Sequence, residues 1–261
     1  MYLPIYILVF VIGVSIGSFI NCLIYRLEKN KSFVKGRSIC PKCKHNLSWL
    51  DLIPLFSFIA LRGKCRYCQK KISYQYPIAE ILTGIIFVLI FKHLIFGIQL
   101  SFNIWILQLL YLWAIASALL IVFIFDLRTY LIPDKVVYPA IFLVLIYQLI
   151  NNYSSLSSIL LSGLGAAGFF FIIWAISRGK WMGFGDVQLA FLMGIFLGWP
   201  NILVALFSSF FLGSIIGVGL IIAGRKKMKS QVPFGPFLVL GTFIALFFGQ
   251  QIINWYLSLM L

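Results

Sequence analysis

The chain is poor in acidic residues and in histidine. Of 261 residues, six are Asp or Glu and two are His, against 21 Lys and Arg. Neither a His-Glu-x-x-His helix nor a Gly-x-Ser-x-Gly turn is present, which argues against a zinc protease and an α/β-hydrolase. Any hydrolytic chemistry must therefore come from carboxylates. The six acids are Glu28, Asp51, Glu80, Asp126, Asp134 and Asp186.

Apolar residues dominate the composition instead. They make up 62% of the chain, and the mean hydropathy is +1.04, well above the range of soluble domains. The apolar runs are unbroken rather than alternating, which favours helices over a β-barrel. We therefore expect an all-α polytopic membrane protein with about eight transmembrane helices. The candidate spans are 3–25, 76–97, 103–126, 135–151, 156–176, 185–198, 201–223 and 234–258.

The first and sixth spans differ from a standard internal transmembrane helix. The first has neither a basic start nor a small-residue cleavage site, so we expect it to be retained rather than removed as a signal peptide. The sixth is short and abuts the seventh across Gly198-Trp-Pro-Asn201. The sixth and seventh segments therefore form either two spans or one re-entrant pair.

Positive charge is distributed unevenly between the two predicted faces of the membrane. The loops 26–75, 127–134, 177–184 and 224–233, counted with Lys135, hold 20 of the 21 Lys and Arg. The positive-inside rule therefore places these loops in the cytoplasm and both termini outside. Anionic lipid headgroups and substrate acids are the expected counter-charges, rather than nucleic acid.

The loop 26–75 contains two Cys-x-x-Cys pairs, Cys40 with Cys43 and Cys65 with Cys68. Four thiolates at this spacing favour zinc, and a cytoplasmic location argues against disulfides; free or redox-active thiols are the alternative. A four-cysteine site has no open position for water, so we expect the zinc to be structural. Residues 49–61 are apolar but too short to span. They form either the core of this loop or a hairpin at the membrane interface, which we favour.

Two of the aspartates lie against apolar spans on the same predicted face. Asp126 ends the third span, and Asp186 begins the sixth directly after Gly183-Phe-Gly185. Paired carboxylates in a low-dielectric site share a proton, so they can activate a water and protonate a leaving amine. The plainer alternative is that Asp126 pairs with Arg128 and Asp186 caps a helix.

The other acids have simpler interpretations. Asp134 is expected to cap the helix of the fourth span, and Glu28 and Asp51 are expected to be loop charges. Glu80 lies about one turn inside the second span and needs a partner there, such as Arg26 or a substrate amine. We therefore assign Glu80, Arg128 and Asp134 supporting roles, structural or in substrate binding.

Several motifs resemble those of the type IV prepilin peptidases, the membrane aspartic proteases of pilus, secretion and competence systems. They occur in order along nearly the whole chain. The motifs are Gly17-Ser-Phe-Ile-Asn21 with Tyr25-Arg26, the two cysteine pairs around Ile53-Pro54 and Leu61-Arg-Gly63, Tyr76-Pro77 with Glu80, Phe125-Asp-Leu-Arg128 with Ile132-Pro-Asp134, Gly183-Phe-Gly-Asp186, and Pro233-Phe-Gly-Pro-Phe237. Gln188 departs from the Lys found in many relatives, and Cys22 replaces an aliphatic residue.

The resemblance implies that Asp126 and Asp186 are catalytic and that Gly183 and Gly185 form the active-site loop. It implies cleavage of the basic leader of prepilins or pseudopilins at the cytoplasmic face of the bacterial inner membrane, after Gly and before Phe or Met. N-methylation of the new terminus with S-adenosylmethionine is a second implied activity. The expected regions are 1–25, a first span; 26–75, the zinc and methyltransferase-associated loop; and 76–261, the peptidase.

Two other functions use the same features differently. A proton- or ion-coupled transporter could use both aspartates as a relay, although transporters favour acids near the middle of the membrane. An inactive scaffold built around the zinc loop is the third hypothesis, and the Gly-x-Gly-Asp loop argues against it.

Overall fold

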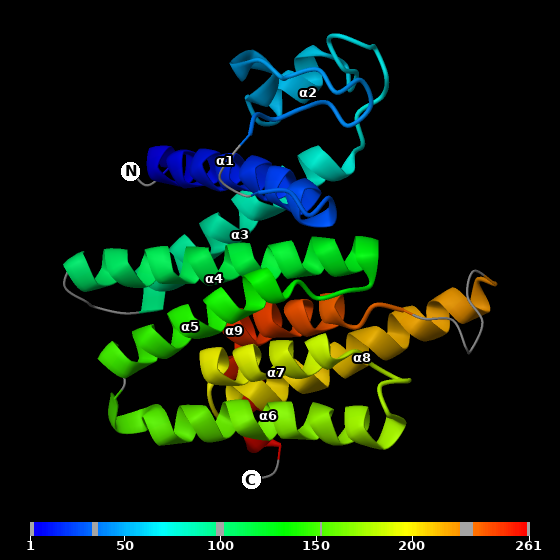
Figure 1. Cartoon of the computed structure of the whole chain (residues 1–261). Helices are drawn as coiled ribbons and strands as arrows, with labels where there is room; N and C mark the ends of the chain where they lie inside the picture. Colours follow the sequence, from blue (N-terminus) through cyan, green and yellow to red (C-terminus); the bar gives the residue numbers. More distant parts are fainter. Residues whose placement is uncertain (1–2, 33–35, 98–101, 152, 225–231, 260–261) are drawn as a thin grey trace. The chain divides into compact units, whose positions relative to one another are not determined.

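The computed structural model describes residues 3–32, 36–97, 102–151, 153–224 and 232–259, and these residues are mostly helical outside the cysteine-containing loop (Figure 1). They form nine α-helices and two short 3-10 helices. In the described ranges no strand forms, and pairing is limited to two isolated bridges, Ile39 with Asn46 and Lys64 with Lys71. The predicted all-α fold is confirmed.

Seven helices are long and apolar enough to cross a membrane by length and composition. They are α1 (Leu3–Glu28), α3 (Gln75–Gly97), α4 (Phe102–Thr129), α5 (Asp134–Asn151), α6 (Leu156–Ser177), α8 (Asn201–Ile222) and α9 (Gly235–Ser258). The sixth predicted span, 185–198, corresponds to α7 (Phe184–Leu197), which has 14 residues. A helix of this length extends about 21 Å, less than the hydrocarbon thickness of about 30 Å.

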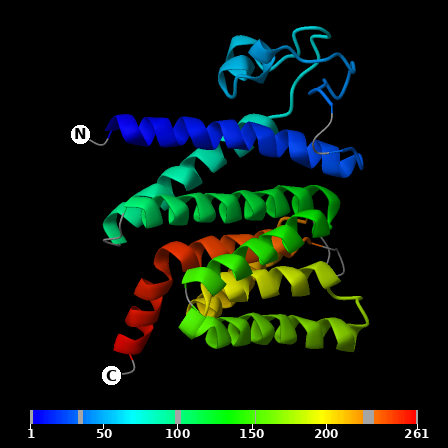
Figure 2. The same cartoon turned by 60° about the vertical axis from the view of Figure 1, so that its left-hand side comes forward.

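The chain divides into two compact units, Met1–Leu120 and Ile121–Leu261, with the boundary inside α4. In the first unit α1 packs against α3, and the two helices cross (Figure 2). The indole of Trp113 in α4 stacks on Phe87 of α3 and donates a hydrogen bond of 3.2 Å to its carbonyl. The cysteine-containing loop carries the 3-10 helix η1 (Trp49–Leu52) and the short α2 (Phe56–Ala60).

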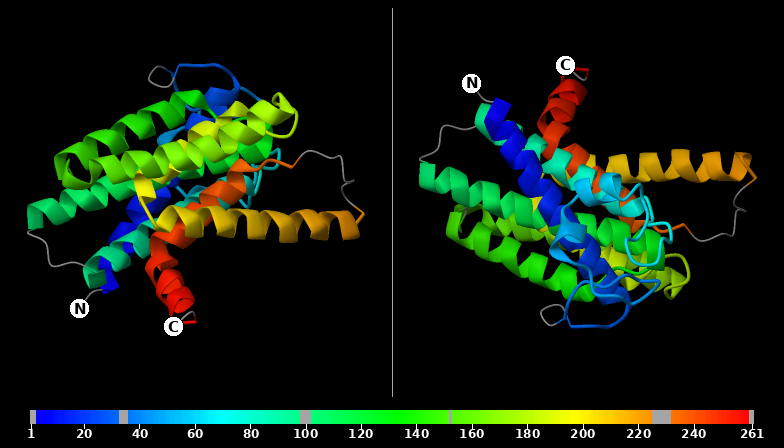
Figure 3. Two further views of the ribbon diagram at one scale, coloured as in Figure 1. Left: turned by 90° about the horizontal axis from the view of Figure 1, so that it is seen from below. Right: turned by 90° about the horizontal axis from the view of Figure 1, so that it is seen from above.

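The second unit is organised around α7. This helix packs against α5, α6, α8 and α9, and α8 lies beside α9 (Figure 3). The side chains of Leu189, Ala190, Met193 and Ile195 are fully buried. Gln148 of α5 also donates a hydrogen bond to the carbonyl of Ile195 at 3.2 Å. This packing fixes the first turn of α7, where Asp186 lies. The remaining element is the 3-10 helix η2 (Tyr153–Ser155).

The apolar segment 49–61 does not form a core for its loop. None of the residues of η1 or α2 is buried, and Trp49 and Ile59 are each more than 70% exposed. Exposure of this kind is compatible with the favoured interfacial hairpin, whose contact with a membrane stays a prediction. The functional division at residue 76 also stays a prediction.

Candidate active site

Asp126 lies in the last turn of α4 and is 4% exposed. Its carboxylate accepts a hydrogen bond from the backbone N–H of Gly235, at the start of α9. A buried carboxylate must be hydrogen-bonded or paired, because removing it from water is costly. The start of α9 therefore holds the carboxylate of Asp126 in place at the end of α4.

Asp186 lies in the first turn of α7 and is 7% exposed. Gly183 is the residue that caps this helix, and its backbone N–H donates to the Asp186 carboxylate. An acid three residues after the cap commonly reaches back in this way. Asp186 therefore lies inside the first turn of α7 and is not itself the cap, so the plainer interpretation placed the start of this helix too late.

The second unit brings the two aspartates together. Asp126 and Asp186 are close enough for their charges to interact, although α4 and α7 are separated in the chain by α5 and α6. Two buried carboxylates in this arrangement favour a state in which one is protonated and the other ionised. Such a pair holds both an acid and a base, as general acid–base hydrolysis requires.

Two glycines allow the segments around the aspartates to approach closely. A Cβ on Gly235 would lie 2.5 Å from Oδ2 of Asp126, and a Cβ on Gly185 would lie 2.7 Å from Cβ of Ile132. The Gly235 position is also 3.4 Å from Cδ1 of Ile132. Ile132, in the turn between α4 and α5, thus lies against both glycine-containing segments. Any larger residue at 185 or 235 would displace one of them.

The predicted supporting residues are more peripheral. Arg128 is exposed in the last turn of α4, where a cation complements the helix dipole. Asp134 is exposed at the start of α5, as expected for a residue that begins a helix. Gln188 donates a hydrogen bond of 2.8 Å to the Tyr138 hydroxyl, which joins α7 to α5.

Glu80 belongs to the first unit and is 8% exposed in α3. Its Oε2 accepts the backbone N–H of Leu55 at 2.9 Å. In the part of the chain that the structure describes, no cation pairs with this carboxylate. The suggested Arg26 instead donates to backbone carbonyls of Ser32 and Gly36.

The four predicted metal ligands come together in the first unit. The sulfur atoms of Cys40, Cys43, Cys65 and Cys68 all lie within 4.8 Å of one another, so they could hold one metal ion. The two Cys-x-x-Cys segments have the same local structure. In each, the first cysteine donates its N–H to a carbonyl five residues on at 2.9 Å and accepts an N–H from four residues on, also at 2.9 Å.

Cys40 and Cys43 of this cluster differ in how strongly they hold their protons. Burial raises the pKa of Cys40, but N–H groups of Cys43 and Lys42 outweigh it and lower this pKa to about 7. The N–H of His45 favours the Cys43 thiolate, but burial and the neighbouring Cys40 and Cys68 raise its pKa to about 11. A metal ion would stabilise all four thiolates together.

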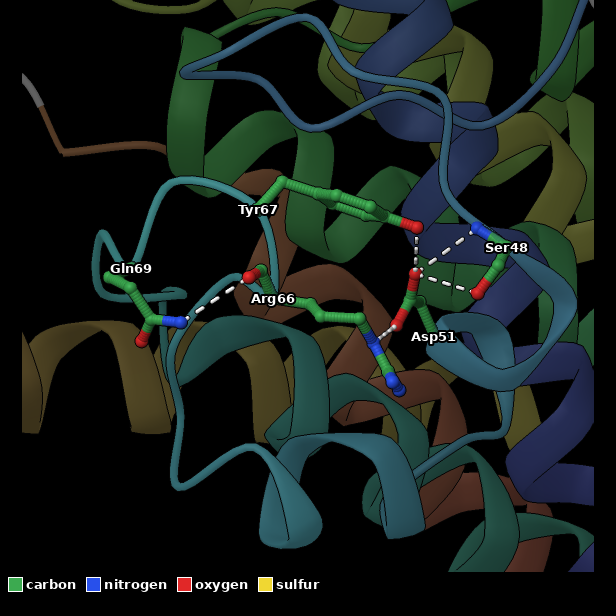
Figure 4. A network of polar contacts seen from close by, with 5 residues as sticks. All are labelled: Ser48, Asp51, Arg66, Tyr67 and Gln69. Atoms are coloured by element: carbon green, nitrogen blue, oxygen red, sulfur yellow. Dashed lines mark hydrogen bonds and ion pairs between the residues drawn. The ribbon is translucent and has the colours of Figure 1, made fainter.

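A polar network joins η1 to the second cysteine pair (Figure 4). Asp51 accepts hydrogen bonds from Ser48, from the Arg66 guanidinium at 2.8 Å and from the Tyr67 hydroxyl at 3.1 Å. Burial raises the pKa of Asp51, but these hydrogen bonds outweigh burial and hold the pKa below its usual range. Asp51 is therefore a structural acid of the loop, since it links segments on either side of α2.

Known proteins have sequences similar to nearly the whole of this chain. Residues 11–94 match the bacterial peptidase A24 N-terminal domain, and residues 113–218 match the type IV leader peptidase family. A prepilin leader peptidase/N-methyltransferase of Bacillus subtilis (strain 168) is 32% identical, with 97% of this chain and 98% of that protein covered. The chain belongs to the type IV leader peptidase family.

Two further relatives with the same name support this membership. The Legionella pneumophila protein is 33% identical and the Aeromonas salmonicida (strain A449) protein 30% identical; in both, 97% of this chain and 94% of the relative are covered. No solved structure matches the chain. The leader peptidase match includes both aspartates, and the N-terminal match includes all four cysteines and Glu80.

The sequence does not predict that Gly235 and Ile132 position the segments around the aspartates. Gly235 was noticed only as part of a Pro-Phe-Gly-Pro-Phe motif, and Ile132 only as part of Ile-Pro-Asp. One signal could have pointed to Gly235, which is followed by Pro236. A Gly-Pro pair ahead of an apolar run is typical of a helix start, and the first residues of a helix have backbone N–H groups without a partner in the helix.

Proposed function

We propose that this protein is a membrane aspartic endopeptidase that removes the leader peptide from type IV prepilins and related pseudopilins. The observation that carries the proposal is the interacting pair of buried carboxylates, Asp126 from α4 and Asp186 from α7. The names of the relatives supply the substrate class, and the carboxylate pair supplies a chemistry that fits it.

Hydrolysis requires both carboxylates. The ionised carboxylate accepts a proton from a water, and the water oxygen attacks the scissile carbonyl. The protonated carboxyl donates a hydrogen bond to that carbonyl oxygen, where negative charge develops. The proton taken from water then passes to the leaving amine as the peptide bond breaks. Which aspartate starts as the base is a property of the pair rather than of either residue.

The location of the pair suits a substrate that is itself a membrane helix. Both acids lie at helix ends, Asp126 in the last turn of α4 and Asp186 in the first turn of α7. A prepilin inserted beside these helices would present its leader junction at the same depth, and this prior alignment lowers the barrier. The positive-inside rule assigns this depth to the cytoplasmic face of the bacterial inner membrane.

N-methylation of the new N-terminal residue is the second proposed activity, and it rests on the full name that the relatives carry. S-adenosylmethionine would supply the methyl group. Zinc is the proposed metal of the four-cysteine cluster, since tetrahedral sulfur ligation with no open position suits it. The zinc would hold the loop in shape and take no part in the chemistry.

The test is cleavage of a purified prepilin by the full-length protein in lipid nanodiscs, with product termini read by mass spectrometry. Asp126→Asn and Asp186→Asn should each reduce cleavage by about a thousandfold or more while thermal unfolding stays close to wild type. Glu28→Gln is the matched control, because it makes the same carboxyl-to-amide change outside the second unit. The cleavage rate of this control should stay within a few-fold of the wild-type rate.

Substantial cleavage by either catalytic variant would exclude the dyad. A transporter that used the same acids would show no prepilin cleavage in the wild-type protein.

A further inference from the structure

The first unit contains a cavity of about 750 Å³ between α1, the cysteine loop and the start of α3. This volume lies within the range of small-molecule and cofactor sites, about 300–1,000 Å³. The cavity is lined entirely by residues of the first unit, and neither Asp126 nor Asp186 is among them. It was not expected from the sequence.

Glu80 is the notable residue of the cavity wall. It is 8% exposed, and its carboxylate is held by the Leu55 N–H and by an interaction with the Ser18 hydroxyl. Neither group is a cation, and no described residue forms an ion pair with Glu80. A buried carboxylate without a cationic partner is costly to keep. The cavity beside it gives space for a cationic ligand.

The backbone at Glu80 is positioned by the closest approach of α1 and α3. A Cβ on Gly17 would lie 2.7 Å from the Glu80 Cα and 3.0 Å from the Thr83 hydroxyl oxygen. One turn later in α1, Asn21 donates a hydrogen bond of 3.0 Å to the Tyr76 carbonyl at the start of α3. Glu80 therefore lies on a rigid helix pair, as a precise binding group requires.

The rest of the wall offers groups of other kinds. Apolar area predominates, with aromatic rings from Phe19, Tyr25, Phe58 and Tyr76. Arg26, Lys31 and Arg37 also line the cavity. The wall thus combines flat apolar surfaces, which suit a purine, with cations, which suit a carboxylate, and the buried carboxylate of Glu80, which suits a positive charge. The second acid of the wall, Asp51, is already paired with Arg66.

S-adenosylmethionine carries all three of these features: an adenine, a carboxylate and a sulfonium. We propose that this cavity binds the methyl donor and that Glu80 is the carboxylate that faces its positive charge. This inference rests on the proposed function, because the methylating activity comes from the names of the relatives.

A carboxylate at the position of Glu80 fits the chemistry of methyl transfer. The nitrogen of the new N-terminal amine attacks the methyl carbon, an N–C bond forms, and the C–S bond breaks with its electron pair going to sulfur. The sulfonium becomes a neutral thioether, and the amine nitrogen loses a proton. A carboxylate beside the reacting groups stabilises the cationic donor, offsets repulsion between sulfonium and amine, and can accept that proton.

The cysteine loop shapes this cavity. Pro41, next to the proposed ligand Cys40, is part of the wall, and so is Asp51, which holds Arg66 and Tyr67 of the second cysteine pair. The four-cysteine cluster and the Asp51 network therefore hold together the loop segments that form this part of the wall. The loop therefore contributes to donor binding by shaping the cavity wall.

The experiment measures equilibrium binding of tritiated S-adenosylmethionine and of S-adenosylhomocysteine to the full-length protein in nanodiscs. Glu80→Gln should weaken binding of S-adenosylmethionine by at least about tenfold. Binding of S-adenosylhomocysteine, which has a neutral thioether in place of the sulfonium, should weaken much less. Glu28→Gln is the matched control, since Glu28 belongs to the same unit but not to the cavity wall. It should change neither affinity.

A second variant tests the cavity without using Glu80. Ser57→Trp places a bulky ring in the wall and should abolish binding of both ligands, whereas Ser73→Trp, at an exposed position outside the cavity, should not. Thermal unfolding of each variant confirms that it is folded. Undiminished donor binding in folded Ser57→Trp, or equal weakening of both ligands in Glu80→Gln, would overturn the proposal.

Prepilin cleavage by the wild-type protein is recorded in parallel. Cleavage without donor binding would reject this inference and keep the peptidase. Donor binding at the cavity without cleavage would reject the peptidase and keep this site.

Discussion

The two units hold their functional carboxylates in different ways. In the second unit, Asp126 and Asp186 are fixed by close helix packing, with glycine at positions where a side chain would collide. In the first unit, Glu80 faces a cavity that is closed on one side by a loop with little core, cross-linked by four cysteines and the Asp51 network. The proposed peptidase site, which depends on helix packing, and the proposed donor site, which depends on the four-cysteine loop, should fail under different perturbations.

The largest expected effect comes from one methyl group added next to the dyad. Gly235→Ala places a Cβ about 2.5 Å from Oδ2 of Asp126, so the carboxylate or the start of α9 must move. We expect prepilin cleavage to fall by about a hundredfold or more, with binding of the methyl donor unchanged. Steady-state cleavage rates and donor titrations measure both effects.

Gly217→Ala is the control for that variant, because a Cβ at this position of α8 meets nothing within 4 Å. It should leave cleavage unchanged. Wild-type cleavage by Gly235→Ala would show that packing at the start of α9 does not position Asp126.

Removing a cysteine addresses the cross-linked unit. Cys40→Ser should reduce bound zinc from one ion per chain to a small fraction and lower donor binding by about tenfold. Cleavage should fall much less. Zinc is measured by elemental analysis of the purified protein, and the same loss is expected after treatment with a strong chelator.

Cys22→Ser is the matched control here, since the Cys22 sulfur lies 3.8 Å from the Ser38 hydroxyl and outside the four-cysteine cluster. It should keep the full metal content. Equal losses of cleavage and donor binding in Cys40→Ser would contradict the separation of the two sites.

The smallest expected effect concerns Asp51. Its pKa is held below the usual range, so its contribution to loop stability is full above the ordinary pKa of about 3.9. That contribution is lost as the pH falls through the lower pKa of the folded state. Asp51→Asn should destabilise the loop by about 1 kcal/mol at neutral pH and remove this acid dependence.

Limited proteolysis of the loop as a function of pH measures this effect. The wild-type loop should become easier to cleave at acid pH, while the variant starts easier to cleave and changes less. Identical pH profiles would show that the Arg66 and Tyr67 contacts contribute nothing to the loop.

The sequence predicts the helices well because apolar runs of 20 or so residues leave few alternatives. It also predicts the four cysteines and the two aspartates, since both sets combine scarce residue types with a recognisable local pattern. Gly235 was not predicted as the partner of Asp126, because their hydrogen bond depends on how α9 packs against α4. Glu80 was recognised as needing a partner, but the cavity beside it depends on the shape of a loop that contains almost no regular structure.

The most direct test of two separate sites gives the protein a substrate that no longer needs cleavage. Asp186→Asn is incubated with S-adenosylmethionine and a prepilin-derived peptide that already carries the free mature N-terminus, and methylation is read by mass spectrometry. Our account predicts methylation at close to the wild-type rate, together with no cleavage of the intact prepilin. Loss of methylation in the folded variant would contradict it, because both reactions would then depend on the same carboxylates.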